Sequence, residues 1–282
     1  MRVEPLHLKL QGLWVGAALG ELYTRGLLNP AQPMDEATAT VQIALPQTYR
    51  LCLLAARWLK AGGDVNADIW HCPRWQDALL NVLPLIFLHG AASYPSPPNA
   101  LPQIFSTVTA ITQTLEWLQR AESPQYLLSY LLQTPSLQDT NLAEQLGTVY
   151  QRLSDRQGLS SLTAQGEATP EQAIAQVLYL LLSTPEDFRL TVQRSAFAIA
   201  SQPELQILLA ALSGFHNGFA NLPLDWRWQL KTIRWSVAMP LEEGLCTLAN
   251  LCAARWAGCY ESDPAQDWSA VAIAASGQLR PR

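Results

Sequence analysis

Residues 12–23 read GLWVGAALGELY, an apolar stretch in which Gly12, Gly16 and Gly20 recur at every fourth position. Glycine in the interior of a helix costs about 1 kcal/mol relative to alanine, so three glycines on one helical face need a physical reason. Two reasons are available: close packing against a second helix, or an approach of the backbone to a bound ligand. The stretch therefore predicts a buried helix with one smooth face, followed at Glu21 by a carboxylate.

The composition of the whole chain is that of a globular protein with a large core. Of its 282 residues, 49% are hydrophobic and 15% are charged, and the formal net charge is −5. Lysine occurs at only three positions and no basic run is present, whereas a groove for a nucleic-acid backbone needs clustered positive charge. These values are not those of a disordered chain, and they argue against a nucleic-acid partner.

Helical periodicity extends through almost the whole sequence, because apolar residues return at intervals of three and four. No segment sustains the two-residue alternation of a strand. We therefore predict an all-α protein whose single domain covers residues 1–282. The helices expected with both ends defined span residues 6–23, 37–59, 73–89, 104–120, 124–133, 137–156, 226–237 and 241–256.

Proline and hydroxyl residues predict where several of these helices begin or break. Pro46 should kink or interrupt the segment 37–59, because proline removes a backbone donor. Thr169 and Thr184 each precede a Pro-Glu pair and are expected to be N-caps, with proline at the first helical position. Ser201 is the expected cap of the helix that follows.

Cysteine usage and targeting signals favour a soluble cytoplasmic protein. The five cysteines form no C-x-x-C pair, so we expect reduced and mostly buried thiols. No signal-peptide pattern opens the chain, and no uncharged apolar run is long enough to cross a bilayer. We therefore expect no transmembrane segment.

The glycine row and a second block near the C-terminus resemble the ADP-ribosylglycohydrolase family. Residues 12–22 follow that family's first helix, G-x-x-x-G-x-x-x-G-D-A-L-G, and residues 184–226 resemble its closing block, with SGFHNG at 213–218 on the A-G-A-x-x-G turn. Weaker matches place residues 37–55 on the T-D-D-T-Q-M-A-L helix and residues 76–88 on N-G-x-x-M-R-x-x-P-L. The resemblance implies the all-helical fold of that family and a cleft that holds two magnesium ions.

The positions that would hold the metal ions lack the family's aspartates. T-D-D-T falls on residues 38–41, which read TATV, and D-T-D-T falls on residues 201–204, which read SQPE. Magnesium needs several anionic oxygens, and neutral hydroxyl or amide oxygens do not offset the cost of taking the ion out of water. The resemblance thus implies the fold but argues against metal-dependent hydrolysis, and we expect no metal or other cofactor and assign no catalytic residue. It places a remnant cleft at Gly16, Gly20, Glu21, Thr38, Thr40, Asn81, Ser201, Gln202, Glu204 and His216.

Other polar residues of the sequence give weaker signals. We interpret His216 and Asn217 as the end of a helix, with Asn217 in the left-handed conformation and His216 favourably placed near the C-terminal carbonyls. His71 and Cys72 are adjacent, but no second pair at zinc-ligand spacing exists. No nucleophile elbow or phosphate-binding glycine loop is present.

Residues 225–235, DWRWQLKTIRW, have the most distinctive local composition. In a continuous helix, Trp228 and Trp235 would share one face and Arg227 and Arg234 would form a parallel row. Tryptophan and arginine are enriched at interface hot spots, but cation–π stacking inside the protein is an equally physical use. The candidate partner-binding residues are Trp226, Arg227, Trp228, Arg234 and Trp235.

Three functional hypotheses follow from this sequence. The first is a protein without catalysis that contacts another protein or its own copy, as a regulatory or assembly module. The second is a binder of ADP-ribose or a related nucleotide in the remnant cleft. The third is a hydrolase with a rewired site that uses Glu21 and Glu204.

Overall fold

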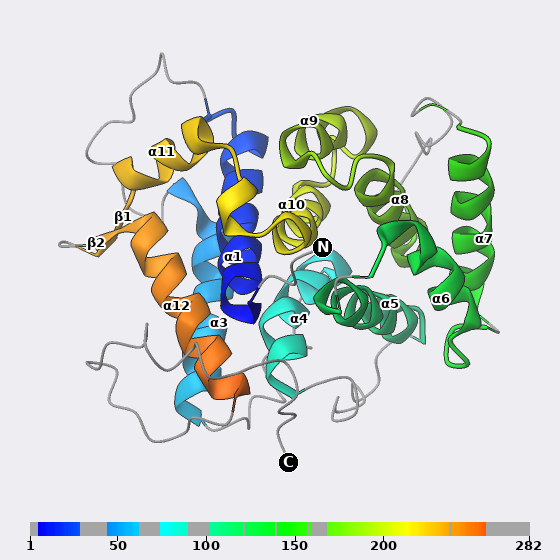
Figure 1. Ribbon diagram of the computed structural model, residues 1–282, viewed down its shortest axis with the longest axis horizontal. Helices are drawn as coiled ribbons and strands as arrows, with labels where there is room; N and C mark the ends of the chain where they lie inside the picture. The colour runs from blue at the N-terminus through cyan, green and yellow to red at the C-terminus, as the bar shows by residue number, and fades with distance from the viewer. Residues whose placement is uncertain are drawn as a thin grey trace.

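The computed structural model describes residues 5–28, 44–61, 74–89, 102–120, 122–138, 140–156, 158, 168–236 and 239–257. These residues form a predominantly helical protein, with one short two-stranded sheet, which confirms the predicted all-α class (Figure 1). None of the described helices combines the length and the apolar character needed to cross a membrane. The prediction of a single domain over residues 1–282 stays a prediction.

Helices follow one another along the described chain, joined by short turns and by segments outside the described residues. The α-helices are α1 (Leu6–Thr24), α3 (Pro46–Ala61), α4 (Trp75–His89), α5 (Pro102–Gln119), α6 (Leu127–Gln133), α7 (Asn141–Ser154), α8 (Pro170–Ser183), α9 (Phe188–Ala198), α10 (Pro203–Asn217), α11 (Leu224–Thr232) and α12 (Leu241–Trp256). Two 3-10 turns, η3 (Pro124–Tyr126) and η5 (Phe219–Asn221), precede α6 and α11, and the strands are β1 (Arg234–Ser236) and β2 (Met239–Pro240).

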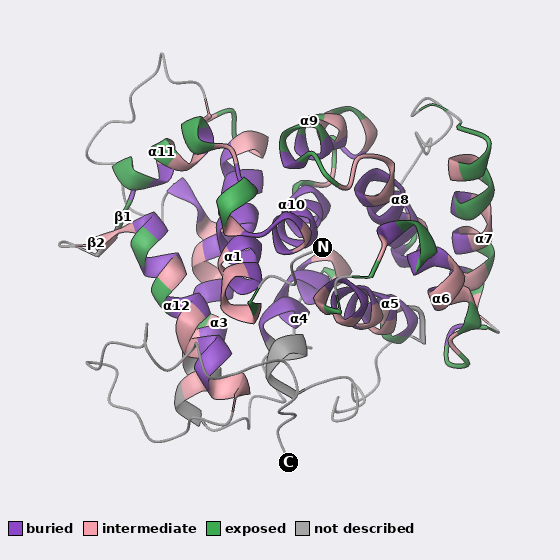
Figure 2. Cartoon of the chain, in the orientation of Figure 1, coloured by how far each residue is buried: buried purple, intermediate pink, exposed green. Residues whose placement is uncertain are grey.

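Helices α1 and α10 cross at the centre of the molecule and are buried along most of their length (Figure 2). The glycine row of α1 faces α10: a Cβ on Gly12 would lie 2.2 Å from the carbonyl oxygen of Gly214, and one on Gly16 would lie 2.5 Å from that of Ala210. A Cβ on Gly20 would meet the Ala210 methyl at 2.5 Å. Since the order of contacts reverses, the helices run antiparallel, and the structure assigns the three glycines to helix packing.

The remaining helices pack around this pair. Helices α3 and α12 lie on one side of α1, with α11 across the top of the view, and α5 to α8 extend away on the other side, with α7 at the far edge (Figure 1). The buried hydrophobic residues form one continuous core to which every described α-helix contributes. Helices α7, α9 and α11 contribute one face each and expose the other (Figure 2). The burial of this core is the main favourable contribution to folding.

A buried lysine on α1 caps a neighbouring helix. Lys9 is 5% exposed, and its amino group donates hydrogen bonds to the carbonyl oxygens of Leu118 and Gln119, at the C-terminal end of α5. The carbonyls at a helix C-terminus carry partial negative charge and lack partners within the helix. Lys9 therefore gives hydrogen-bond partners to the last carbonyls of α5. The same hydrogen bonds offset the energetic cost of burying the positive charge of Lys9.

Most helix boundaries agree with the sequence expectations. Helix α12 spans the predicted residues, α1 ends one residue later, and Thr169 forms a capping box with Gln172. Helix α3 begins at Pro46, and the predicted residues 37–43 lie outside the described part of the chain. Pro84 lies inside α4, where a helix was expected to continue past it.

Two predicted caps and one predicted turn were wrong. Asp187 caps α9 by accepting a hydrogen bond from the Leu190 amide, so the cap is not Thr184. The N-cap of α10 is Gln202 and not Ser201, and no side chain caps this helix. At the other end of α10 the left-handed residue is Gly218, with φ of 71°, whereas Asn217 still belongs to the helix.

The predicted helix 226–237 was also wrong. Helix α11 ends at Thr232, because Ile233 adopts an extended conformation with φ of −88° and ψ of 138°. The chain then forms β1, which pairs in antiparallel fashion with β2. The side chain of Ile233 is fully buried, and its carbonyl accepts the amide of Leu241 at the start of α12.

The described cysteines are free and shielded from solvent, as expected. Cys52 and Cys252 are buried, and Cys246 is half-buried. Burial raises the pKa of both Cys246 and Cys252 to about 12, so these thiols stay protonated and unreactive near neutral pH. Cys72 and Cys259 lie outside the described residues.

The glycine contact can be tested with a matched pair of alanine substitutions. Gly16→Ala should lower the free energy of unfolding by about 2–4 kcal/mol, because the added methyl would meet the backbone of α10. Gly147→Ala, in α7, should raise it by about 0.5–1 kcal/mol, because nothing lies within 4 Å of the added Cβ and alanine is the better helix former. Urea denaturation followed by circular dichroism measures both, and equal effects of the two changes would contradict the packing assignment.

Candidate functional site

Glu21, the carboxylate that ends the glycine row, caps the N-terminus of α3. It is 1% exposed, and its two oxygens accept the backbone amides of Gln47, at 3.0 Å, and Thr48, at 2.7 Å. The Thr48 hydroxyl adds a third hydrogen bond at 2.8 Å. Because the first amides of a helix lack internal partners and carry partial positive charge, an anionic oxygen is favourable there. Every strong contact of Glu21 thus serves the fold.

Burial nonetheless makes the charge of Glu21 costly. Desolvation raises the pKa of this carboxyl above its ordinary value of 4.5, and the hydrogen bonds from Thr48 and Gln47 and the nearby Arg25 oppose that rise. Arg25 lies 3.6 Å from the Glu21 carboxylate, one helical turn further along α1. Glu21 is therefore a buried carboxylate near the end of α1 that pairs with an arginine one turn away.

A chain of ion pairs links α3, α4 and α10 at the positions that the resemblance assigned to the remnant cleft. Asp77, 2% exposed, lies between two guanidinium groups: Arg50 reaches it at 3.0 Å and Arg74 at 3.2 Å. Arg50 also donates to Asn81 at 3.1 Å, and Arg74 pairs with the buried Glu204 at 2.7 Å. We call these five residues the Arg50–Glu204 network. Its two positive and two negative charges cancel.

The network leaves no free carboxylate for a cation. Two residues of the predicted cleft, Asn81 and Glu204, are joined to the network through Arg50 and Arg74 respectively. The carboxylate of Glu204 raises the pKa of the Arg74 guanidinium, which is the mark of a close charge pair. Within the described residues, no group of three or more His, Cys, Asp or Glu side chains has the geometry to hold a metal ion.

The other predicted cleft residues are dispersed. Ser201 is exposed, and the buried side-chain oxygen of Gln202 accepts no hydrogen bond from the described residues. His216 lies at the opposite end of α10 from Glu204, about 18 Å away at 1.5 Å per residue. Gly16 and Gly20 pack on α10, as described above, and Thr38 and Thr40 lie outside the described residues.

His216 is placed at a helix C-terminus, as predicted, but it lies in a shielded position. Its Nε2 is 3.8 Å from a carboxylate oxygen of Glu186, and its side chain is 9% exposed. Desolvation lowers the pKa of His216, the Glu186 carboxylate raises it, and the ammonium of Lys9 lowers it. His216 lies in the last turn of α10 and is not part of the Arg50–Glu204 network.

The five candidate partner-binding residues do not form the predicted stripe. Trp228 and Trp235 do not share a helical face, and Arg227 and Arg234 do not form a row, because α11 ends between them. The five residues divide into buried and exposed members: Trp226 is 7% exposed, Trp235 packs on Gly244, Arg227 pairs with Glu242 at 2.6 Å, Arg234 is exposed, and Trp228 is 61% exposed.

Helices α9 and α11 each carry two exposed large hydrophobic side chains. Leu190 and Phe197 lie seven positions apart on α9, and Leu224 and Trp228 lie four positions apart on α11, with exposed fractions between 41% and 79%. An ion pair between Arg189 and Asp225 joins the two helices. We call the exposed residues Leu190, Phe197, Leu224 and Trp228 the α9–α11 surface. Sequence reasoning found Trp228 and missed the α9 residues, whose seven-residue spacing was the available signal.

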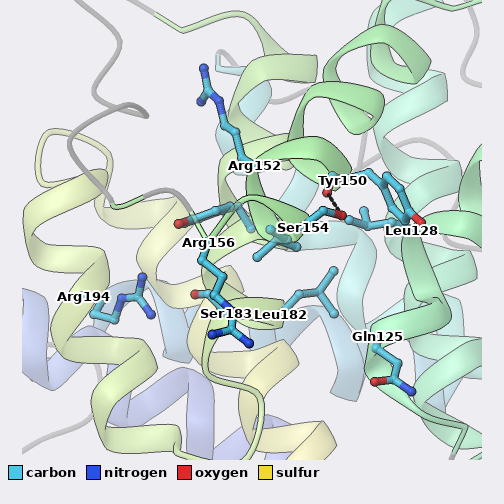
Figure 3. Close-up of a pocket in the computed structure, with 11 residues that line it drawn as sticks. Gln125, Leu128, Tyr150, Arg152, Ser154, Arg156, Leu182, Ser183 and Arg194 are labelled. Atoms are coloured by element: carbon cyan, nitrogen blue, oxygen red, sulfur yellow. Dashed lines mark hydrogen bonds between the residues drawn. The ribbon is translucent and has the colours of Figure 1, made fainter.

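A pocket that the sequence interpretation did not predict lies among helices α6 to α9. It has a volume of about 510 Å³ and is bounded by η3, α6, α7, α8 and α9 (Figure 3). None of the residues that line it belongs to the predicted remnant cleft. The lining residues are Gln125, Leu128, Tyr150, Arg152, Leu153, Ser154, Arg156, Tyr179, Leu182, Ser183 and Arg194.

Comparison of the chain with protein-family models, with curated proteins and with solved structures gives no match. The resemblance described from the sequence therefore stays an expectation.

The cap on α3 predicts a pH dependence of stability. A raised pKa means that the folded protein binds the Glu21 proton more tightly than the unfolded chain, so this residue contributes most below about pH 4.5. Its contribution falls as the pH rises from there through the folded-state pKa and is constant above it. Urea denaturation across pH 4–8 should show the free energy of unfolding of the wild type falling relative to that of Glu21→Gln over that interval, because glutamine does not titrate. A wild type that gains stability relative to Glu21→Gln as the pH rises would contradict the dominance of desolvation.

Proposed function

We propose that this chain is a non-catalytic protein similar to the ADP-ribosylglycohydrolases, and that it acts by contacting another protein. The observation that carries the proposal is the engagement of both candidate acidic residues within the fold. Glu21 is bound by the amides of α3, and Glu204 is bound by Arg74. A metal ion or a reacting water would have to compete with these contacts.

The physical comparison with a metal site favours the same conclusion. A pair of divalent ions would add four positive charges to the site. Each ion would need several oxygen ligands, carboxylates among them. The Arg50–Glu204 network instead supplies two guanidinium groups to two carboxylates and is neutral without an ion. Adding divalent cations beside Arg50 and Arg74 would be repulsive. The charged residues of this network thus link α3, α4 and α10 by ion pairs.

The α9–α11 surface supports a partner-facing role. Trp228 and Phe197, exposed at 61% and 79%, are large side chains whose burial would contribute strongly to binding. The Lys231 amino group lies 5.0 Å from the centre of the Trp228 ring, so a positive charge stands next to this exposed aromatic side chain. The ion pair of Arg189 with Asp225, and the stacking of that arginine on Trp226, hold the two helices in place.

Charge indicates the kind of partner that would fit. The two helices carry four cationic side chains and a single carboxylate, in a chain whose net charge is −5. Arg189 is already paired with Asp225, and Arg227 and Lys231 lie beside Glu242 of α12. Since most of these charges are paired within the protein, a largely apolar segment would match the exposed hydrophobic side chains. The cationic residues are Arg189, Arg194, Arg227 and Lys231, and the carboxylate is Asp225.

The two other sequence hypotheses have less support. A nucleotide in the remnant cleft would need polar groups that are free to receive it, whereas Asn81 and Glu204 are bound to arginines. A rewired hydrolase would need Glu21 as a base, whereas that carboxylate accepts three hydrogen bonds from α3. Self-association through the α9–α11 surface would make the partner a second copy of this chain.

The partner-facing role can be tested by capture from the native cell with a matched control. Trp228→Ala should weaken partner capture by about thirtyfold, the effect of removing a tryptophan hot spot of about 2 kcal/mol. Tyr126→Ala, which removes an aromatic side chain of similar exposure from η3, should capture the same protein as the wild type. Both variants should keep the wild-type unfolding temperature, because both side chains are exposed. Equal capture by the two variants would argue against the α9–α11 surface, and sedimentation that changes only in Trp228→Ala would identify a second copy as the partner.

The absence of metal chemistry is tested separately. Calorimetric titration with magnesium or manganese should give no stoichiometric binding at millimolar concentration, because the carboxylates are already paired. ADP-ribosyl-arginine and ADP-ribosyl-serine substrates should not be hydrolysed. Hydrolysis that is abolished by Glu21→Gln, with the variant still folded, would instead support the rewired hydrolase.

A further inference from the structure

The pocket between α6, α7, α8 and α9 has an unusual charge. Three of its eleven lining residues are arginines, Arg152, Arg156 and Arg194, and none is a carboxylate. Among the described residues, no acidic side chain pairs with any of these three arginines. By contrast, Arg50, Arg74, Arg189 and Arg227 each contact a carboxylate elsewhere in the molecule.

Helix ends explain only part of this charge. Arg152 lies in the last turn of α7 and Arg156 follows that helix, where positive charge is favourable near the terminal carbonyls. Arg194 has no such reason, because it lies before the last turn of α9. It is half-buried, so part of its hydration is lost without a carboxylate to compensate. An anion in the pocket would supply the missing partner.

The side chains differ in their direction. Arg194 extends from α9 toward the other lining residues, whereas Arg152 extends away from them (Figure 3). Arg156 holds a left-handed backbone conformation, with φ of 53°, at the point where the chain leaves α7. Arg194 and Arg156 are therefore the arginines best placed to contact a ligand, while Arg152 adds to the positive potential.

The remaining lining groups favour a ligand that carries acceptors and an apolar part. The Ser154 hydroxyl already donates to the carbonyl of Tyr150 (Figure 3), and the Ser183 hydroxyl donates to that of Leu180, so both offer a ligand only acceptor lone pairs. The guanidinium groups are then the principal donors. Apolar and aromatic surface comes from Leu128, Tyr150, Leu153, Tyr179 and Leu182. The volume of about 510 Å³ is that of an ordinary small-molecule site.

We propose that this pocket binds a small organic phosphate, with the phosphate group at Arg156 and Arg194 and the organic part against the leucines and tyrosines. A phosphate monoester carries between one and two negative charges near neutral pH and accepts bidentate hydrogen bonds from arginine. It therefore balances two guanidinium groups better than a single carboxylate does. The site is separate from the Arg50–Glu204 network and does not depend on the proposed function.

The proposal is tested by calorimetric titration of the full chain with AMP, phenyl phosphate, adenosine and citrate. AMP or phenyl phosphate should bind and adenosine should not, and binding should weaken as the salt concentration rises. Arg194→Gln and Arg156→Gln should each weaken binding by about tenfold or more. Arg120→Gln, at the exposed end of α5, should bind as the wild type does.

Thermal unfolding without ligand shows whether each variant is folded. Arg156 is exposed and follows α7, so Arg156→Gln keeps the test valid if Arg194→Gln does not fold. Three results would overturn the proposal: no binding of either phosphate at millimolar concentration, binding that both pocket variants retain in full, or binding of citrate without binding of either phosphate.

Discussion

The contact between the backbones of α1 and α10 is the constraint on which the rest of this structure depends. Gly12 and Gly214 face each other so closely that a single added carbon on either would fall 2.2 Å from the oxygen of the other. Both helices are buried along most of their length, which places the charges of α1 inside the protein. Lys9 and Glu21 are then compensated by the ends of α5 and α3. Lys9 and Glu21 are the two buried charged residues among the described residues of α1, and through them α1 contacts the ends of two other helices.

Two regions of the molecule differ in whether their charged side chains are paired within the protein. In the Arg50–Glu204 network, positive and negative groups are matched inside the fold, and the chemistry available to a ligand is small. In the pocket between α7 and α9, the guanidinium groups have no such partners among the described residues. The arginines of this network are 36% and 55% exposed and its carboxylates are buried, so removal of an arginine would leave a buried carboxylate without its partner. The second arrangement is incomplete as it stands, and an external anion is what would complete it.

Sequence reasoning predicted those features that depend on local pattern. The glycine row, the boundaries of α12 and the Thr169 cap were predicted correctly because spacing and residue type determine them. The helix 226–237 was wrong because Ile233 is extended and buried in the core, and this tertiary contact overrides the helical periodicity on both sides of it. The role of Glu21 could not be predicted, since its partner amides belong to another helix, and the pocket arginines come from α7 and α9, which only the fold brings together.

The pairing of the first helix with one of the last has a consequence for biosynthesis. Helix α1 leaves the ribosome long before α10 is made, and at ordinary translation rates the interval is on the order of ten to forty seconds. During that time the glycine face of this apolar helix has no partner, although α3 and α5, whose ends meet its two charges, are made earlier than α10. The nascent chain is therefore exposed to aggregation through its first turns, and α1 is the segment at which a chaperone would act.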